Sequence, residues 1–247
     1  MDFVLILVQE IQIITAGLEM FTDSVLVKVL IGIVYGVLLG AVTVPLSKKL
    51  TLNRTEDPVK AAPLNKSLFK ILSPAVGIIA SVAVSLTAED TASFIRNLLI
   101  LVPMFSIAVV DALIRKIPNS LLLVMIIIQV PYITYTCVIE KSPEPLFLAF
   151  VGFIIGFASC AVPSKKLPIG SGDTKYCALI GGTLGLTLYM QSVVLMGLIG
   201  LVILVYLKVS KKGGVKTMIP MGPLISLSSV ISICFPVLLS LIGNIWN

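Results

Sequence analysis

Two aspartates, Asp111 and Asp173, have sequence surroundings in which an ionisable side chain can do chemistry. Asp111 lies in VVDALIRKIPNSLLL, about one helical turn before an apolar stretch gives way to a polar turn at Pro118. Asp173 lies in GSGDTK, framed by Gly170 and Gly172, where another apolar stretch begins. Ionisable residues within apolar membrane segments are costly, and they commonly mark functional sites. Both aspartates are therefore candidates for a catalytic or binding role.

Both aspartates also have a purely structural interpretation, which the sequence leaves open. Asp111 is four residues before Arg115, a spacing that favours an ion pair on one helix face. Asp173 is followed by an apolar run from Thr174, so it could cap the first turn of a helix. The neighbouring glycines could serve a tight turn or give the loop freedom to move.

The composition predicts an integral membrane protein. Of the 247 residues 57% are apolar and 12% are charged, and the mean hydropathy is +1.11. The apolar runs are continuous rather than alternating, which favours helices over a β-barrel. We therefore expect an all-α, polytopic transmembrane helical bundle with about eight spans, near residues 24–46, 67–87, 92–113, 119–139, 146–163, 174–188, 190–208 and 220–245.

The charged residues predict the orientation of these spans. If the connecting segments alternate sides, most of the 18 Lys and Arg residues fall on one side and most of the 12 Asp and Glu residues on the other. The positive-inside rule makes the basic side cytoplasmic. The net charge of +6 then reflects topology and contact with membrane lipid, and predicts no nucleic-acid partner. Asp111 and Asp173 are expected at the same cytoplasmic depth on different helices.

The chain divides into three predicted segments. Residues 1–23 are interrupted by polar side chains and predict a segment in the outer interface, with an extra span as the alternative. Residues 24–110 form the N-terminal helices, with a polar cytoplasmic loop at 45–67, and residues 111–247 form a bundle that carries both aspartates. Small-xxx-small patterns predict close helix packing at Gly32, Gly36, Gly40, Gly152 and Gly156.

The cysteines predict neither a metal centre nor a redox site. The four cysteines are far apart in the sequence, and the chain has no histidine. Zinc and iron–sulfur sites need clustered thiolate or imidazole ligands. We therefore expect no metal, and expect each cysteine to act as a small buried apolar side chain.

Two carboxylates that meet define a specific chemistry. They cannot both ionise cheaply, so they share one proton. The ionised member can take a proton from water as it attacks a peptide carbonyl, while the protonated member polarises that carbonyl. This is aspartic protease chemistry, and it requires no cofactor.

Three stretches in order carry a resemblance to a known family: Asp111 followed by IPN at 117–119, GSGDTK at 170–175, and IPMGP at 219–223. The chain resembles the type IV prepilin peptidases, membrane aspartic peptidases with a GxGD signature that are related to archaeal preflagellin peptidases. The resemblance implies that Asp111 and Asp173 are catalytic, that the active-site loop contains Gly170, Gly172 and Lys175, and that the motif residues are Pro118, Asn119, Pro220, Gly222 and Pro223. We expect Asn119 to cap the helix that follows it, and Lys175 to mark the cytoplasmic boundary.

The resemblance implies an activity and a place. Such an enzyme removes the short basic leader of a prepilin, pseudopilin or preflagellin-like precursor at the cytoplasmic face of the cell membrane. Many bacterial relatives carry two CxxC pairs in the loop after the first span, but residues 45–67 contain no cysteine. S-adenosylmethionine is therefore implied as a cofactor only if the chain also methylates the new amino terminus.

Two other classes of function remain as alternatives. An ion-coupled transporter also uses membrane-embedded aspartates, but its sites are expected near the bilayer midplane. A non-catalytic scaffold of a secretion system would use both aspartates only as structural caps. Asparagine can cap a helix but cannot share a catalytic proton, so it distinguishes these alternatives from a peptidase.

Overall fold

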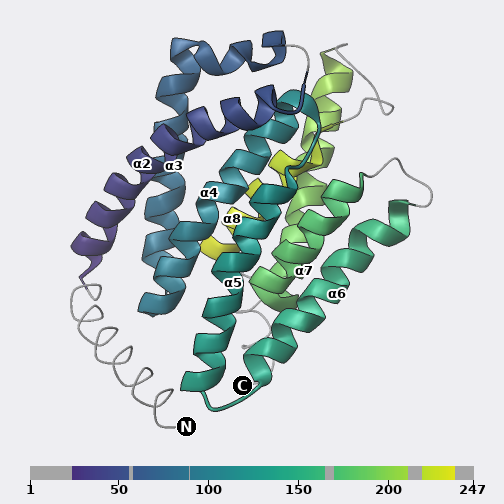
Figure 1. Ribbon diagram of the computed structural model, residues 1–247. Helices are drawn as coiled ribbons and strands as arrows, with labels where there is room; N and C mark the ends of the chain where they lie inside the picture. The colour runs from purple at the N-terminus through teal and green to yellow at the C-terminus, as the bar shows by residue number, and fades with distance from the viewer. Residues whose placement is uncertain (1–23, 56–57, 89, 165–169, 211–218, 237–247) are drawn as a thin grey trace.

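The structure is a computed structural model that describes residues 24–55, 58–88, 90–164, 170–210 and 219–236 (Figure 1). The predicted interfacial segment 1–23 lies outside these residues. The described chain is helical, and its elements are α2 (Val25–Leu52), the 3-10 helix η1 (Pro58–Asn65), α3 (Ser67–Thr87), α4 (Thr91–Ile114), α5 (Asn119–Ile139), α6 (Glu144–Ser164), α7 (Ser171–Val209) and α8 (Met221–Cys234).

The helices have the lengths and composition of membrane spans. Six of the described helices, α2 to α7, are long and apolar enough to cross a bilayer, and α8 is a shorter apolar helix of 14 residues. Large apolar side chains such as Leu68 and Ile79 are exposed on the outside of the bundle, where lipid would cover them. The predicted all-α, polytopic bundle is confirmed.

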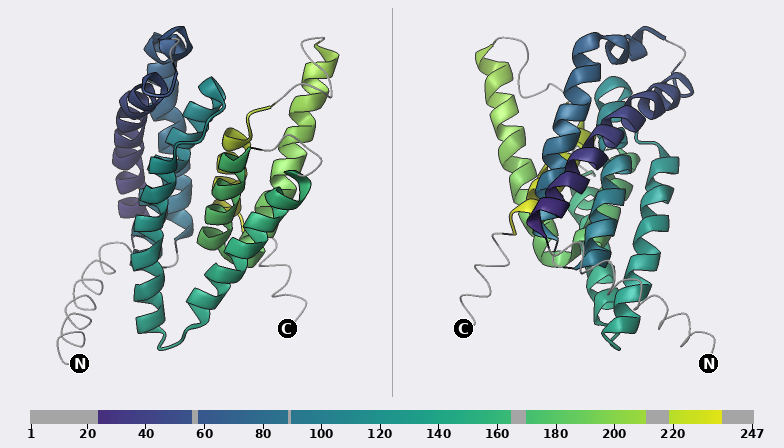
Figure 2. Two further views of the ribbon diagram at one scale, coloured as in Figure 1. Left: turned by 45° about the vertical axis from the view of Figure 1, so that its right-hand side comes forward. Right: turned by 90° about the vertical axis from the view of Figure 1, so that its left-hand side faces the viewer.

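Helix α7 contains two of the predicted spans, joined at Gly185. This residue has φ 71° and ψ 178°, a conformation that is essentially restricted to glycine. Before the break, Tyr176 contacts Ser226 near the start of α8, and after it Gln191 contacts the carbonyl of Phe235 beyond the end of α8. The two limbs, 171–184 and 186–209, therefore run in opposite directions, as both views in Figure 2 show. The predicted boundary after residue 188 is three residues too late.

The cytoplasmic loop predicted at 45–67 is shorter than expected. Helix α2 continues through Pro45 to Leu52, and η1 occupies most of the remaining loop. The last turns of α2 bury Ser47 and Thr51, while η1 buries Leu64. Packing of η1 against the end of α2 thus offsets the proline and the polar composition from which a loop was predicted.

Glycines bring two pairs of helices into close contact, as their spacing predicts. A Cβ atom added at Gly36 in α2 would overlap the backbone of Ile78 in α3. A Cβ atom added at Gly152 in α6 would overlap the carbonyl of Gly181 in α7. The contact at Gly152 holds the first limb of α7, which begins with the candidate loop, against α6.

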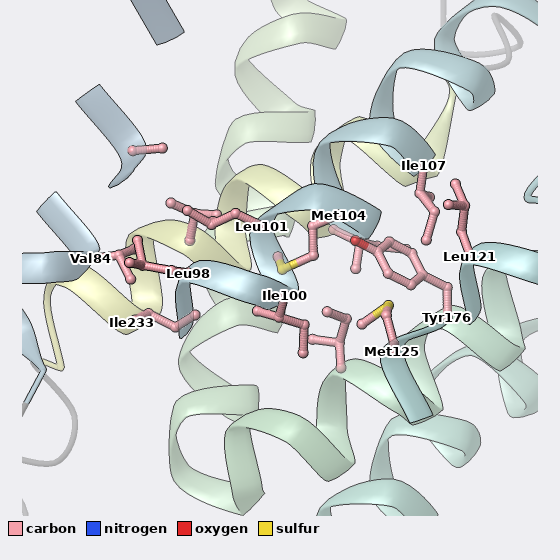
Figure 3. Packing of buried hydrophobic residues seen from close by; sticks show 14 of the residues in the cluster. Val84, Leu98, Ile100, Leu101, Met104, Ile107, Leu121, Met125, Tyr176 and Ile233 are labelled. Atoms are coloured by element: carbon pink, nitrogen blue, oxygen red, sulfur yellow. The ribbon is translucent and has the colours of Figure 1, made fainter. Parts of the chain in front are cut away.

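Helix α4 lies at the centre of the bundle and positions Asp111. It is the most buried of the six candidate spans, and Ile100, Met104 and Ile107 are fully buried. These side chains form one cluster with Tyr176 of α7 and Leu121 of α5 (Figure 3). Because α4 packs on several neighbours, its last turn cannot shift without disturbing this core.

Candidate active site

Asp111 lies in the last turn of α4 and faces the amino terminus of α8. Its side chain is buried, with 4% of its surface exposed, and Oδ2 accepts a 2.8 Å hydrogen bond from the Gly222 N–H. The first N–H groups of a helix have no partner within that helix, so they are natural donors to a carboxylate. Helix α4 then ends at Arg115, which adopts the left-handed conformation (φ 53°, ψ 42°) and donates its N–H to the Asp111 carbonyl.

Asp173 lies in the first turn of α7 and is half-buried. Its Oδ2 accepts a 3.1 Å hydrogen bond from the Gly170 N–H, and the Gly170 carbonyl accepts from the Thr174 N–H. Helix α7 begins at Ser171 with Gly170 as its N-cap, so Asp173 does not occupy the N-cap position that its structural interpretation assigned to it. The aspartate instead makes the return bond of a capping box, because the helix starts three residues earlier than expected.

The two aspartates lie at the same end of the bundle and interact. The Asp173 carboxylate is within Coulombic range of the Asp111 carboxylate. The segments that carry them also touch, because a Cβ atom at Gly172 would lie 3.2 Å from Cβ of Ile117, in the turn after α4. The structure therefore brings together the two acids that the sequence places 62 positions apart.

A polar chain beneath the aspartates ties together the three helices that position them. The Tyr176 hydroxyl is 2.6 Å from Oγ of Ser226. The Ser226 hydroxyl donates a 3.1 Å hydrogen bond to the Met104 carbonyl. Tyr176 is fully buried one turn after Asp173. These bonds join α7, α8 and α4 just below the acids.

Gly222, which the resemblance gives only as a motif residue, contacts Asp111 directly. A Cβ atom at Gly222 would lie 2.8 Å from Cβ and 2.9 Å from Oδ2 of Asp111. No side chain fits in that space, so glycine lets the N-terminus of α8 reach the carboxylate. Pro220 is the N-cap of α8, and Pro223 lines an apolar groove between α8, α3 and α4.

The other motif residues lie around the same end. Pro118 is the N-cap of α5, and its carbonyl accepts from the N–H groups of Leu121 and Leu122. Asn119 is the first residue of α5 and makes no capping bond, so its predicted role as the N-cap is wrong. Asn119 and the exposed Lys175 line an apolar cavity of about 540 Å³ between α5, α6 and α7.

Sequence reasoning missed several residues of this region. Tyr176 and Ser226 are polar positions within apolar runs, and a buried serine stripe on α8 was a signal that this helix faces the bundle interior. Cys160 and Cys177 are both buried, and their sulfur atoms lie 2.6 Å apart across α6 and α7. Nothing in their spacing of 17 residues indicated that contact.

Comparison with known proteins agrees with the motifs. Residues 98–205 match the model of the type IV leader peptidase family, a range that includes both aspartates, the Pro118 turn and both limbs of α7. No curated protein and no solved structure matched the chain. This match supports the family predicted from the motifs, and over residues 98–205 the chain is similar to the type IV leader peptidases.

Proposed function

We propose that the protein is an aspartic endopeptidase in which Asp111 and Asp173 form the catalytic couple. The observation that carries this proposal is that the two carboxylates lie at one end of the bundle, within Coulombic range of each other. Each accepts a backbone N–H, from Gly222 and Gly170 respectively, so each is held by its surroundings rather than free to rotate. Preorganised acids of this kind are what acid–base catalysis requires.

The couple hydrolyses the peptide bond with one shared proton. Its ionised member removes a proton from water, the hydroxide equivalent attacks the peptide carbonyl, and the protonated member donates to the carbonyl oxygen. Collapse of the tetrahedral intermediate returns a proton to the leaving amine, and the couple regains its starting state. The roles belong to the pair and not to either residue alone.

The depth of the couple suits a substrate held in the membrane. Asp111 is three residues before the end of α4, and Asp173 is the third residue of α7, so both lie roughly one turn, about 5 Å, inside the helix ends. Asp173 is half-buried, which leaves an approach for water. A precursor could keep its apolar helix in lipid while its leader enters the site from the aqueous side.

The positive-inside rule makes that aqueous side the cytoplasm. We therefore propose that the substrate is a prepilin, pseudopilin or preflagellin-like precursor with a short basic leader, cut at the cytoplasmic membrane face. The cut needs no cofactor. We propose no methylation of the new amino terminus, because the segment 45–67 has no cysteine.

The test mixes purified protein with a candidate precursor in detergent and identifies the new amino terminus by mass spectrometry. We expect one cut at the end of the leader, no added methyl group, and no cut by the Asp111→Asn or Asp173→Asn variant. Cleavage retained by either folded variant overturns the proposal. If the variants lose ion-driven transport in liposomes but cleave normally, the transporter is favoured. If they lose neither transport nor cleavage, the scaffold is favoured.

A further inference from the structure

A polar cavity lies at the end of the bundle opposite the two aspartates. Its volume is about 390 Å³, and it is bounded by the start of α4, the second half of α5, the start of α6 and the Gly185 break in α7. Arg96 in its wall is 15 residues before Asp111 on α4, which corresponds to about 22 Å. The cavity is therefore separate from the catalytic couple.

Part of its polar wall is explained by the break in α7. The last carbonyls before a helix break have no partner in the helix, and lipid offers none. Arg96 donates to the Thr183 carbonyl at 3.1 Å, and Gln129 donates to the Gly182 carbonyl at 3.4 Å. The Arg96 guanidinium also lies 4.6 Å from the centre of the Tyr132 ring.

The break does not use all of these polar groups. Nε of Arg96 and Oε1 of Gln129 are buried without a hydrogen-bond partner. Glu140 and Glu144 line the same cavity and are exposed. One cation and two carboxylates therefore line the same cavity.

We propose that this cavity binds a zwitterionic phosphoethanolamine group, with its phosphate towards Arg96 and its ammonium towards Glu140 and Glu144. A simple anion would meet two carboxylates, and a simple cation would meet the guanidinium, so a ligand that carries both charges fits best. A primary ammonium can donate hydrogen bonds to the Glu140 and Glu144 carboxylates, whereas a quaternary ammonium can donate none.

The surroundings suit the headgroup of a phospholipid. The cavity opens beside Leu148 of α6, whose side chain is 45% exposed, and Ile133 of α5 also lines it. Figure 1 shows α5 and α6 joined by a short connection at this end, so the cavity lies where a headgroup layer would be. A phosphatidylethanolamine could place its headgroup inside and its acyl chains along the lipid-facing surface.

The experiment measures retained ligand by native mass spectrometry. Delipidated full-length protein is offered palmitoyl-oleoyl phosphatidylethanolamine, the matching phosphatidylcholine, the matching phosphatidylglycerol, or soluble phosphoethanolamine. We expect the ethanolamine lipid to be retained at least about tenfold better than the choline lipid, which corresponds to one charge-assisted hydrogen bond. Binding of soluble phosphoethanolamine alone would identify a soluble source of the same chemistry.

Variants decide whether the cavity is responsible. Arg96→Gln should abolish retention, but it also removes the bond to Thr183, so folding is checked by thermal unfolding. The Glu140→Gln/Glu144→Gln double variant changes only exposed side chains, and should reduce the preference for ethanolamine over choline to about one. Lys141→Gln removes a charge at the same end without lining the cavity, and should keep the preference. Equal retention of the two lipids by the unmodified protein, or an unchanged preference in the double variant, overturns the proposal.

Discussion

At each end of the bundle a charged side chain meets the backbone of a helix terminus, and both the charge and the kind of terminus differ between the ends. At one end, Asp111 accepts from the first turn of α8, and Asp173 lies in the first turn of α7. At the other end, Arg96 donates to a carbonyl at the break that ends the first limb of α7. Unpaired N–H groups favour an anion and unpaired carbonyls favour a cation, so each end matches the backbone that it meets.

The two ends differ in what the charged side chains can still do once their hydrogen bonds to the backbone are made. At the first end the half-buried Asp173 lies within Coulombic range of the buried Asp111, which is an arrangement for chemistry. The cation at the second end stabilises a helix break, and Arg96 also lines a polar cavity together with Glu140 and Glu144. The predictions that follow change one end at a time and measure cleavage and stability separately.

The largest expected effect is on cleavage when either acid is neutralised. Asp111→Asn and Asp173→Asn should each lower the cleavage rate by about 10²–10⁴-fold, the usual contribution of general acid–base catalysis. Asparagine still accepts the N–H of Gly222 or Gly170, so thermal unfolding should change little. A rate assay paired with a melting curve checks both, and a rate within tenfold of the unmodified protein would contradict the catalytic assignment.

A methyl group at Gly222 should disturb the geometry of the site at the first end without replacing either aspartate. Gly222→Ala places a Cβ atom 2.8 Å from Cβ of Asp111 and displaces the carboxylate or the start of α8. A shift of about 1 Å can cost about 10²-fold in rate, so we expect a loss of that order. Gly197→Ala is the matched control, because nothing lies within 4 Å of a Cβ atom there. Equal rates for the two variants would show that this close contact does not matter.

A methyl group at Gly185 should affect stability at the second end. The conformation at φ 71° and ψ 178° costs a non-glycine residue about 1–3 kcal/mol. Gly185→Ala should therefore lower the unfolding temperature, by about 2–4 °C per kcal/mol for a chain of this size. An unchanged melting curve, measured against Gly197→Ala, would mean that the break tolerates a side chain.

The smallest expected effects distinguish two tyrosines whose hydroxyls form hydrogen bonds between helices. Tyr176→Phe removes the bond to Ser226 beside the acids, and Tyr35→Phe removes a 2.7 Å bond to the Leu98 carbonyl between α2 and α4. Each loss should cost about 1 kcal/mol of stability. Only Tyr176→Phe should also slow cleavage, by a few-fold. If both variants cleave equally fast, the polar chain below the acids stabilises the bundle without positioning the catalytic pair.

Hydropathy and charge were sufficient to predict the helical class and the shared depth of Asp111 and Asp173. Both follow from where apolar runs end, which is a local property of the chain. The contact of Gly222 with Asp111 joins residues 111 positions apart, so no local pattern contains it. The predicted first residues of α7 and α5 were three residues and one residue too late, since these helices begin at Ser171 and Asn119. Gly170 and Pro118 act as the N-caps, in place of the polar residues that were expected there.

The account depends most on Asp111 and Asp173 acting as one unit, and the double variant Asp111→Asn/Asp173→Asn tests this directly. Residues that share one proton are strongly non-additive, so the initial cleavage rate of the double variant should equal that of either single variant. All three rates are measured on one precursor. If the double variant instead loses the product of the two single losses, the acids act independently, and the proposed couple does not exist.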